Sequence, residues 1–236
     1  PRSTPKPSSA ASDVYKRQKM VFTSSMAVYG GQEPPFTEDK QPQPIDPYGI
    51  AKYAVECDLK LAHEQFGLRY NIVRPHNVLG TYQNIWDRYR NVIGIFIRKT
   101  LNGIPILVYG DGEQTRAFSD IKYYMEPFDL LLEEFDGEIF NIGADKYFSL
   151  NQVAETVQAV GKKYGYDVPI EHAPPRHEVK HAYCDHTKAK SMLGFKDNTR
   201  LEELIEDVFV WAMKEPNRKV KDREYEITKD IYDYWK

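Results

Sequence analysis

A tyrosine and a lysine four residues apart, together with one serine, could form an acid–base site in this chain. On a helix, Tyr48 and Lys52 would share one face, where the ammonium stabilises the phenolate and makes the phenol usable as a base near neutral pH. Ser25 follows a short apolar run, and open α/β sheets place their sites at strand ends. The other Tyr-x-x-x-Lys matches lie in charged or irregular terminal stretches and are interpreted as surface: Tyr15/Lys19, Tyr225/Lys229 and Tyr232/Lys236. The three residues Ser25, Tyr48 and Lys52 therefore predict an oxidoreductase-type site.

The composition indicates a globular, cytoplasmic protein. Of the 236 residues, 41% are hydrophobic and 13% aromatic, which is enough for a sizeable core. The net charge of −3 without a basic stripe argues against nucleic-acid binding. No apolar run approaches the roughly 18 residues of a membrane span, and the N-terminus lacks a signal-peptide core. Two cysteines fit a reducing compartment and argue against a disulfide framework, although they leave a single disulfide bond open.

Strand and helix patterns alternate along the chain and predict an α/β fold. Strands are expected at residues 20–23, 68–74, 106–109 and 138–142. Helices are expected at 47–66, 91–101, 122–135 and 150–164, with a last one after Thr199 as its N-cap. The first strand–helix–strand unit indicates a right-handed parallel crossover. Residues 1–18 are rich in Pro, Ser and Ala without apolar period, and are expected to be disordered or foreign to the fold.

The segments 25–30 (SMAVYG), 47–52 (PYGIAK) and 74–80 (RPHNVLG) together resemble motifs of the extended short-chain dehydrogenase/reductase family, and within it those of the NAD-dependent nucleotide-sugar epimerases of the UDP-glucose 4-epimerase type. Residues 25–30 resemble the family's Ser-x-x-Val-Tyr-Gly, and residues 47–52 its Pro-Tyr-x-x-x-Lys. Residues 74–80 are similar to the segment whose asparagine faces the nucleotide diphosphate. The segments occur in family order and spacing, and the resemblance covers roughly residues 19–215.

The resemblance implies the second half of a doubly wound parallel, Rossmann-like sheet with a smaller α/β substrate-binding domain. Residues 19–80 would belong to the NAD-binding domain and 81–215 mainly to the nucleotide-sugar domain, with a return of 117–143 to the sheet left open; 216–236 would be a charged tail. The family's Gly-x-x-Gly-x-x-Gly, which cradles the NAD pyrophosphate, does not occur in the sequence. About a hundred N-terminal residues of a family member are thus expected to be missing, and the chain alone to bind NAD poorly or not at all.

The resemblance also implies roles for individual residues. Ser25, Tyr48 and Lys52 would be catalytic, and no metal is expected. The residues expected to contact NAD are Thr23, Ser24, Tyr48, Lys52 and Pro75. The residues expected to contact a UDP-sugar are Ser25, Asn77, Asn91, Val92, Tyr109, Arg116, Arg176 and Tyr183. Two guanidinium groups suit a diphosphate, because each presents a fork of donors.

The implied reaction is epimerisation at C4 of a UDP-hexose through a 4-keto intermediate, in a homodimer. Met26 and Ala27 stand where the family's dehydratases carry an acid and a base, which disfavours dehydration and makes decarboxylation less favoured. Tyr183 is similar to the residue whose bulk limits the C2 substituent, which favours glucose and galactose over N-acetyl sugars. UDP-glucuronate 4-epimerase and decarboxylase activities remain alternatives.

Two readings from other classes stay open. His177, Glu178 and His181 match His-Glu-x-x-His, the zinc-protease motif. The segment follows Pro174 and Pro175 and lacks a long amphipathic helix, so zinc hydrolysis is the weaker hypothesis. The chain could also be a non-catalytic fragment that binds a nucleotide sugar.

Overall fold

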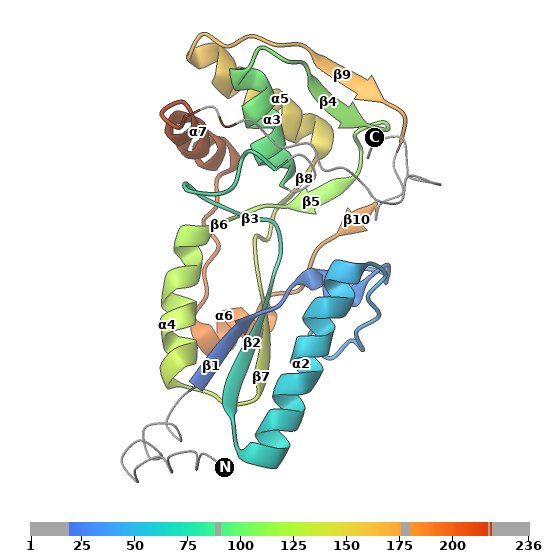
Figure 1. Ribbon diagram of the computed structural model, residues 1–236, viewed down its shortest axis with the longest axis vertical. Coiled ribbons are helices and arrows are strands. Elements are labelled where there is room, and N and C mark those ends of the chain that lie inside the picture. Colours follow the sequence, from blue (N-terminus) through green and yellow to red (C-terminus); the bar gives the residue numbers. More distant parts are fainter. Residues whose placement is uncertain (1–18, 88–90, 176–179, 217, 219–236) are drawn as a thin grey trace, which may run out of the picture.

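The computed structural model describes residues 19–87, 91–175, 180–216 and 218. It has an α/β architecture, with a sheet-containing unit below a helix-rich unit in Figure 1. The expectations for residues 1–18 and for most of the tail after 216 lie outside the described residues. Both cysteines, Cys57 and Cys184, are unpaired. No helix in the described ranges is long and apolar enough to cross a membrane.

The main sheet contains three parallel strands in the order β1-β2-β7. These are β1 (Lys19–Thr23), β2 (Arg69–Pro75) and β7 (Glu138–Ile142). Helix α2 (Pro47–Phe66) connects β1 to β2, which pair in parallel, so the predicted strand–helix–strand unit is confirmed. The parallel sheet confirms the predicted fold class.

Helices cover both faces of this sheet (Figure 1). Leu59 of α2 packs on one face, against a cluster that includes Tyr70 and Ile72. On the other face lie α4 (Met125–Glu133) and α6 (Thr187–Leu193), whose cluster includes Leu131, Leu193, Val73, Phe140 and Ile142. Successive residues of β2 therefore serve opposite layers, as the period of two in a strand requires.

Side chains occupy the outer edge of β7. The carboxylate of Glu38 accepts a hydrogen bond from the backbone amide of Asn141 at 2.8 Å. The ammonium of Lys188 donates to the backbone oxygen of Ile139 at 2.8 Å and also bonds Glu138. Two backbone groups that a further strand would need are thus already bonded.

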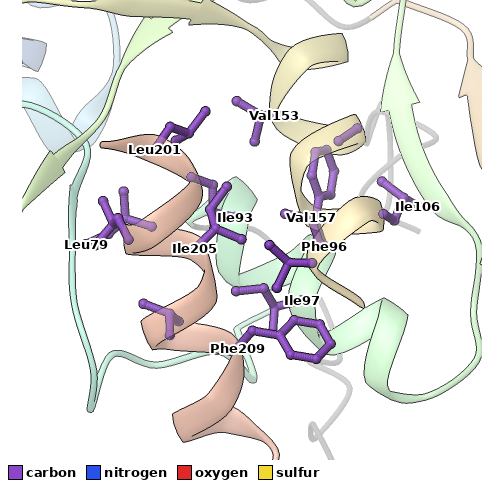
Figure 2. Packing of buried hydrophobic residues seen from close by; sticks show 14 of the residues in the cluster. Leu79, Ile93, Phe96, Ile97, Ile106, Val153, Val157, Leu201, Ile205 and Phe209 are labelled. Carbon is purple, nitrogen blue, oxygen red and sulfur yellow. The ribbon is translucent and has the colours of Figure 1, made fainter. Parts of the chain in front are cut away.

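The helix-rich unit has its own core (Figure 2). Helices α3 (Val92–Leu101), α5 (Leu150–Lys163) and α7 (Leu201–Ala212) contribute most of it. Two parallel strands, β4 (Ile106–Tyr109) and β9 (Ile170–Ala173), pack beside these helices. Phe96, Val157 and Phe209 are at most 2% exposed, so this unit buries enough apolar surface to form a core.

Short strands join the two units. β5 (Thr115–Ala117) pairs with β8 (Tyr147–Ser149) and with β10 (His181–Ala182). β3 (Val78–Leu79) pairs with β6 (Ser119–Asp120). Two 3₁₀ helices complete the described elements, η1 (Met26–Tyr29) after β1 and η2 (Ile121–Tyr124) before α4.

The predicted helix ends are partly right. Asp46 caps α2, Gly67 ends it with φ +71°, and Ser149 forms a capping box on α5. The expected N-cap Thr199 is wrong, because its hydroxyl instead accepts from the amide of Asp120, and α7 begins without a side-chain cap. The helix expected at 122–135 begins as η2, and the α-helix starts only at Met125.

Candidate functional site

Helix α2 places Tyr48 and Lys52 at the carboxyl edge of the main sheet. The ammonium of Lys52 donates to the backbone oxygen of Thr23, the last residue of β1, at 2.7 Å. It also lies 5.7 Å from the centre of the Tyr48 ring. Tyr48 is 55% exposed, so its hydroxyl is accessible to a ligand. The structure thus brings the predicted tyrosine and lysine together at a strand end.

Ser25 lies directly beyond β1, against the start of α2. Its hydroxyl oxygen accepts from the amide of Ala27 at 3.2 Å and so caps η1. A Cβ on Gly49 would lie only 2.6 Å from the backbone oxygen of Ala27. Glycine at position 49 therefore allows the first turn of α2 to contact the turn that Ser25 begins. This contact places Ser25 and Tyr48 on neighbouring segments.

Three residues expected to contact the UDP-sugar lie beyond β2 and at the start of α3, and the first of them, Asn77, is the one expected to face the diphosphate. Asn77 is exposed and has φ +42°. Its side-chain Nδ2 donates to the backbone oxygen of Ala117 at 2.9 Å, and its side-chain oxygen can still accept a bond from a ligand. Asn91 is the N-cap of α3, with φ +66°, and its amide bonds Gln83. Val92, the first residue of α3, is partly buried.

A pocket of about 550 Å³ lies at the end of β4. Its lining residues are Tyr109, Gly110, Asp111, Gln114, Ala173, Pro175 and Lys180. It combines the aromatic ring of Tyr109 with proline and alanine, and polar groups reach it from the Gly110–Gly112 turn. An aromatic ring flanked by a few polar groups is typical of a small-molecule pocket, and that Tyr109 lies against a base stays a prediction. We call this pocket the base pocket after that prediction.

Arg116 lies on β5 beside this pocket. Its guanidinium donates to the backbone oxygens of Thr115 at 2.8 Å and of Lys180 at 3.1 Å. The second predicted arginine, Arg176, lies outside the described residues. The structure therefore positions one of the two guanidinium groups expected to hold a diphosphate.

Tyr183 does not share a face with Arg116. Ala182 pairs with Arg116, so these two side chains lie on the same face of the β10-β5-β8 sheet. Tyr183 follows on the opposite face, where its ring stacks on Tyr147 with centroids 5.3 Å apart and planes at 18°. Ala182 packs with Met26, which directly follows the predicted catalytic serine. A role for Tyr183 in limiting the sugar pocket thus stays a prediction, and the structure places alanine on the face that carries the arginine.

Comparison with known proteins decides the family. Residues 9–143 match the NAD dependent epimerase/dehydratase family. The chain belongs to this family. It is 36% identical over 209 residues to the putative UDP-glucose 4-epimerase of Methanocaldococcus jannaschii, across 86% of the chain and 66% of that relative. It is 32% identical over 209 residues to the UDP-N-acetyl-alpha-D-glucosaminuronate decarboxylase of Bacillus cytotoxicus, across 83% and 64%.

A solved structure shows the same fold. The UDP-glucose 4-epimerase of Thermotoga maritima with UDP-glucose superposes with a TM-score of 0.75 at 32% identity, across 84% of this chain and 64% of that one. This member of the epimerase/dehydratase family therefore spans about two thirds of the length of these relatives. The expected family membership and fold are confirmed.

The cofactor of the family is NAD, and the residues present fit one end of it. Thr23 is exposed, and the Lys52 ammonium has two N–H groups beyond the one bonded to Thr23, which suits the hydroxyls of a ribose. Pro75 is partly exposed at the end of β2. Ser24 gives little support to the expected NAD contact, because it is only 1% exposed, its hydroxyl donates to Glu56 at 2.5 Å and its amide donates to the backbone oxygen of Val73.

The zinc hypothesis has little support in the described residues. His181 lies in strand β10 and its Nδ1 is 2.8 Å from the hydroxyl of Thr115, whereas the zinc-protease motif needs a helix through both histidines. His177 and Glu178 lie outside the described residues. No group of three potential metal ligands occurs in the part of the chain that the structure describes.

Sequence reasoning missed two parts of the site. The base pocket is also lined by Gln114 and Lys180, neither of which was predicted as a site residue: Gln114 lies in the segment 109–116 that contains Tyr109 and Arg116, whereas Lys180 carries no motif. Glu56 is buried beneath the predicted catalytic residues, and its spacing of four from Lys52 is the one signal that could have identified it.

Proposed function

We propose that this family member catalyses NAD-dependent epimerisation at C4 of a UDP-hexose, of the UDP-glucose/UDP-galactose type, through a 4-keto intermediate. One observation carries the proposal. Ser25, Tyr48 and the Lys52 ammonium, bonded to Thr23, meet at the carboxyl edge of a parallel sheet. This is the edge at which open α/β sheets bind their ligands.

The proposed chemistry assigns one task to each side chain. The Tyr48 phenolate oxygen accepts the proton of the sugar 4-hydroxyl as C4 is oxidised, and the resulting phenol returns it when C4 is reduced on its other face. Lys52 stabilises the phenolate by its charge, and Ser25 bonds the same sugar oxygen. NAD, when bound, supplies reversible hydride acceptance at C4.

The residues beside Ser25 favour epimerisation over dehydration. Met26 and Ala27 form the first turn of η1, and neither side chain can transfer a proton. The same argument weakens, without removing, the alternative of a decarboxylase, and it does not bear on the alternative of a UDP-glucuronate 4-epimerase. The similarity to the Bacillus cytotoxicus decarboxylase keeps that alternative as the second candidate.

The base pocket supports a nucleotide-linked substrate. Tyr109 offers a ring for stacking, and Arg116 is one strand away, where a diphosphate attached to the base could reach it. We propose Asn77, Asn91 and Val92 as further contacts on the substrate side. We also propose that the missing Gly-x-x-Gly-x-x-Gly cradle must be supplied for tight NAD binding and turnover.

We further propose that the active form is a cytoplasmic homodimer that pairs through α2. Ile50 and Leu61 are more than half exposed, and Ala54 lies between them on the same side of the helix. Apolar side chains spaced 4 and 11 residues along a helix form a continuous stripe. Exposed stripes of this kind commonly mark protein interfaces.

Two measurements test the proposed function. Calorimetry should show UDP binding to the 236-residue chain, with loss of binding in Tyr109→Ala. Turnover is measured on the extended chain, defined as this chain preceded by a family segment that carries the glycine-rich cradle. It should interconvert UDP-glucose and UDP-galactose faster than UDP-glucuronate, and Tyr48→Phe should lower kcat by about 100- to 10,000-fold. Retained turnover in Tyr48→Phe would reject Tyr48 as the base, and preference for UDP-glucuronate would favour the second candidate.

A further inference from the structure

A buried ion pair lies beneath the predicted catalytic residues of α2. Glu56 and Arg74 are 5% and 2% exposed. The Nη2 and Nε atoms of Arg74 donate to Oε2 and Oε1 of Glu56 at 2.6 and 3.0 Å, which forms a two-pronged bond. Both planar groups are thus held at a fixed distance and in a fixed relative orientation.

The ion pair is extended on both sides by hydrogen bonds. Ser24 donates its hydroxyl to Oε1 of Glu56 at 2.5 Å. On the other side, Nη1 of Arg74 donates to the Tyr29 hydroxyl at 2.8 Å, and Tyr29 donates to the side chain of Asn141 at 2.8 Å. The network therefore connects β2, β7, α2 and η1 with Ser24, the residue directly after β1.

Stability alone is a weak explanation for this network. Removing two charges from water is costly, and apolar residues of similar volume are often as stable. Apolar side chains, however, permit small rotations and shifts that a two-pronged ion pair does not. The distinctive property of the network is that it fixes position.

The position that it fixes is that of the candidate site. Tyr48, Lys52 and Glu56 are spaced by four residues, so they follow one stripe along α2. Any rotation or axial shift of α2 that moved the Tyr48 hydroxyl would also stretch the bonds between Glu56 and Arg74. At the same time, Glu56 holds Ser24, whose neighbour Ser25 is the other predicted partner of the substrate oxygen. One carboxylate thus controls both segments.

We propose that Glu56 is a positioning residue that sets the separation of Tyr48 and Ser25 through its bonds to Arg74 and Ser24. It does not touch the substrate and does not transfer a proton. The inference rests on the proposed function, because the rate that it predicts is that of the proposed epimerase. It also predicts that the loss appears in kcat, since the base pocket and Arg116 lie in other elements.

The test is Glu56→Gln in the extended chain, which keeps the side-chain shape but removes the charge. We expect kcat for UDP-glucose to fall at least tenfold, with KM and UDP affinity changed by less than twofold. In a Tyr48→Phe background, Glu56→Gln should cause no further loss, because it would act through the residue already removed. A purely structural role would instead lower the activity of both backgrounds by the same factor.

Controls separate the possible failures. Glu138→Gln should keep wild-type kcat. It removes the 2.7 Å ion pair to Lys188 at the first residue of β7, away from the carboxyl end where Asn141 joins the network. If Glu56→Gln does not fold, Ser24→Ala decides the question, because it removes the hydrogen bond between Ser24 and Glu56 and leaves the ion pair between Glu56 and Arg74. In Ser24→Ala, kcat should fall about threefold at unchanged KM. Unchanged kcat in the folded Glu56→Gln or, in its place, in Ser24→Ala overturns the inference. Retained turnover in Tyr48→Phe would instead overturn the proposed base.

Discussion

Acidification from pH 7.5 to 4.5 should weaken this fold by about 3 kcal/mol through one buried histidine, His76. His76 follows β2 and is 2% exposed. Its Nε2 lies 2.8 Å from Nε2 of His186, whose Nδ1 lies 3.2 Å from the carboxylate of Asp145. Asp145 is also bonded by the ammonium of Lys190. Burial, and then the charge of His186 when protonated, lower the pKa of His76 to about 3.

The sign and the size of this change in the free energy of unfolding follow from proton linkage. An unfolded histidine has a pKa of about 6.5, so between pH 6.5 and 3 the unfolded chain binds a proton that the native state does not. This stability is fully present above pH 6.5 and is lost at about 1.4 kcal/mol per pH unit below it. Two units below 6.5 correspond to about 3 kcal/mol at pH 4.5. Burial also lowers the pKa of His186, which acts in the same direction.

Urea unfolding at pH 7.5 and 4.5, followed by circular dichroism, measures this effect in the 236-residue chain. Many carboxylates also titrate in this range, so the informative quantity is the difference between wild type and His76→Phe. The variant should lose about 3 kcal/mol less than wild type on acidification. His63→Gln, at an exposed histidine, should keep the wild-type loss. Equal losses in wild type and His76→Phe would refute the reasoning.

Three further outcomes can be measured directly. Phe209→Ala, at a side chain with no exposed surface in the core of Figure 2, should lower the free energy of unfolding by about 3–5 kcal/mol, while UDP affinity at 15 °C should stay the same. Arg116→Lys keeps the charge but loses the fork, and should weaken UDP binding about tenfold by calorimetry, because a lysine cannot make two parallel bonds. Leu61→Glu should shift the extended chain from dimer to monomer in sedimentation. Lys60→Glu, at the preceding exposed position, should leave the dimer intact. A dimer in both variants would contradict pairing through α2.

Local patterns predicted most of the elements because their causes are local. Helix α2 and strands β4 and β7 have the predicted bounds, since proline, glycine and apolar runs mark their ends within a few residues. Ser149 was recognisable as an N-cap from its place before an apolar period. The family motifs placed Tyr48 and Lys52 on one helix for the same reason.

What escaped prediction depends on contacts between distant residues. Thr199 has the right type for a cap, but a bond to Asp120, 79 residues away, takes its hydroxyl. His76 and His186 are 110 residues apart, and nothing in either segment indicates the other. The face on which Tyr183 lies depends on the pairing of β10 with β5, two residues long, which no periodicity can reveal.

The side chains bonded along β7 make one edge of the main sheet less available to a further strand than the other. With Glu38 and Lys188 bonded to the backbone of β7, a new strand would have to displace both before it could pair there. β1 has no partner strand on its outer side among the described residues, and its exposed Met20 offers apolar surface. Any polypeptide that completes this sheet is therefore directed to β1, beside the bond between Lys52 and Thr23. The bonded edge of β7 thus favours pairing at β1, the strand whose last residue accepts the hydrogen bond from Lys52.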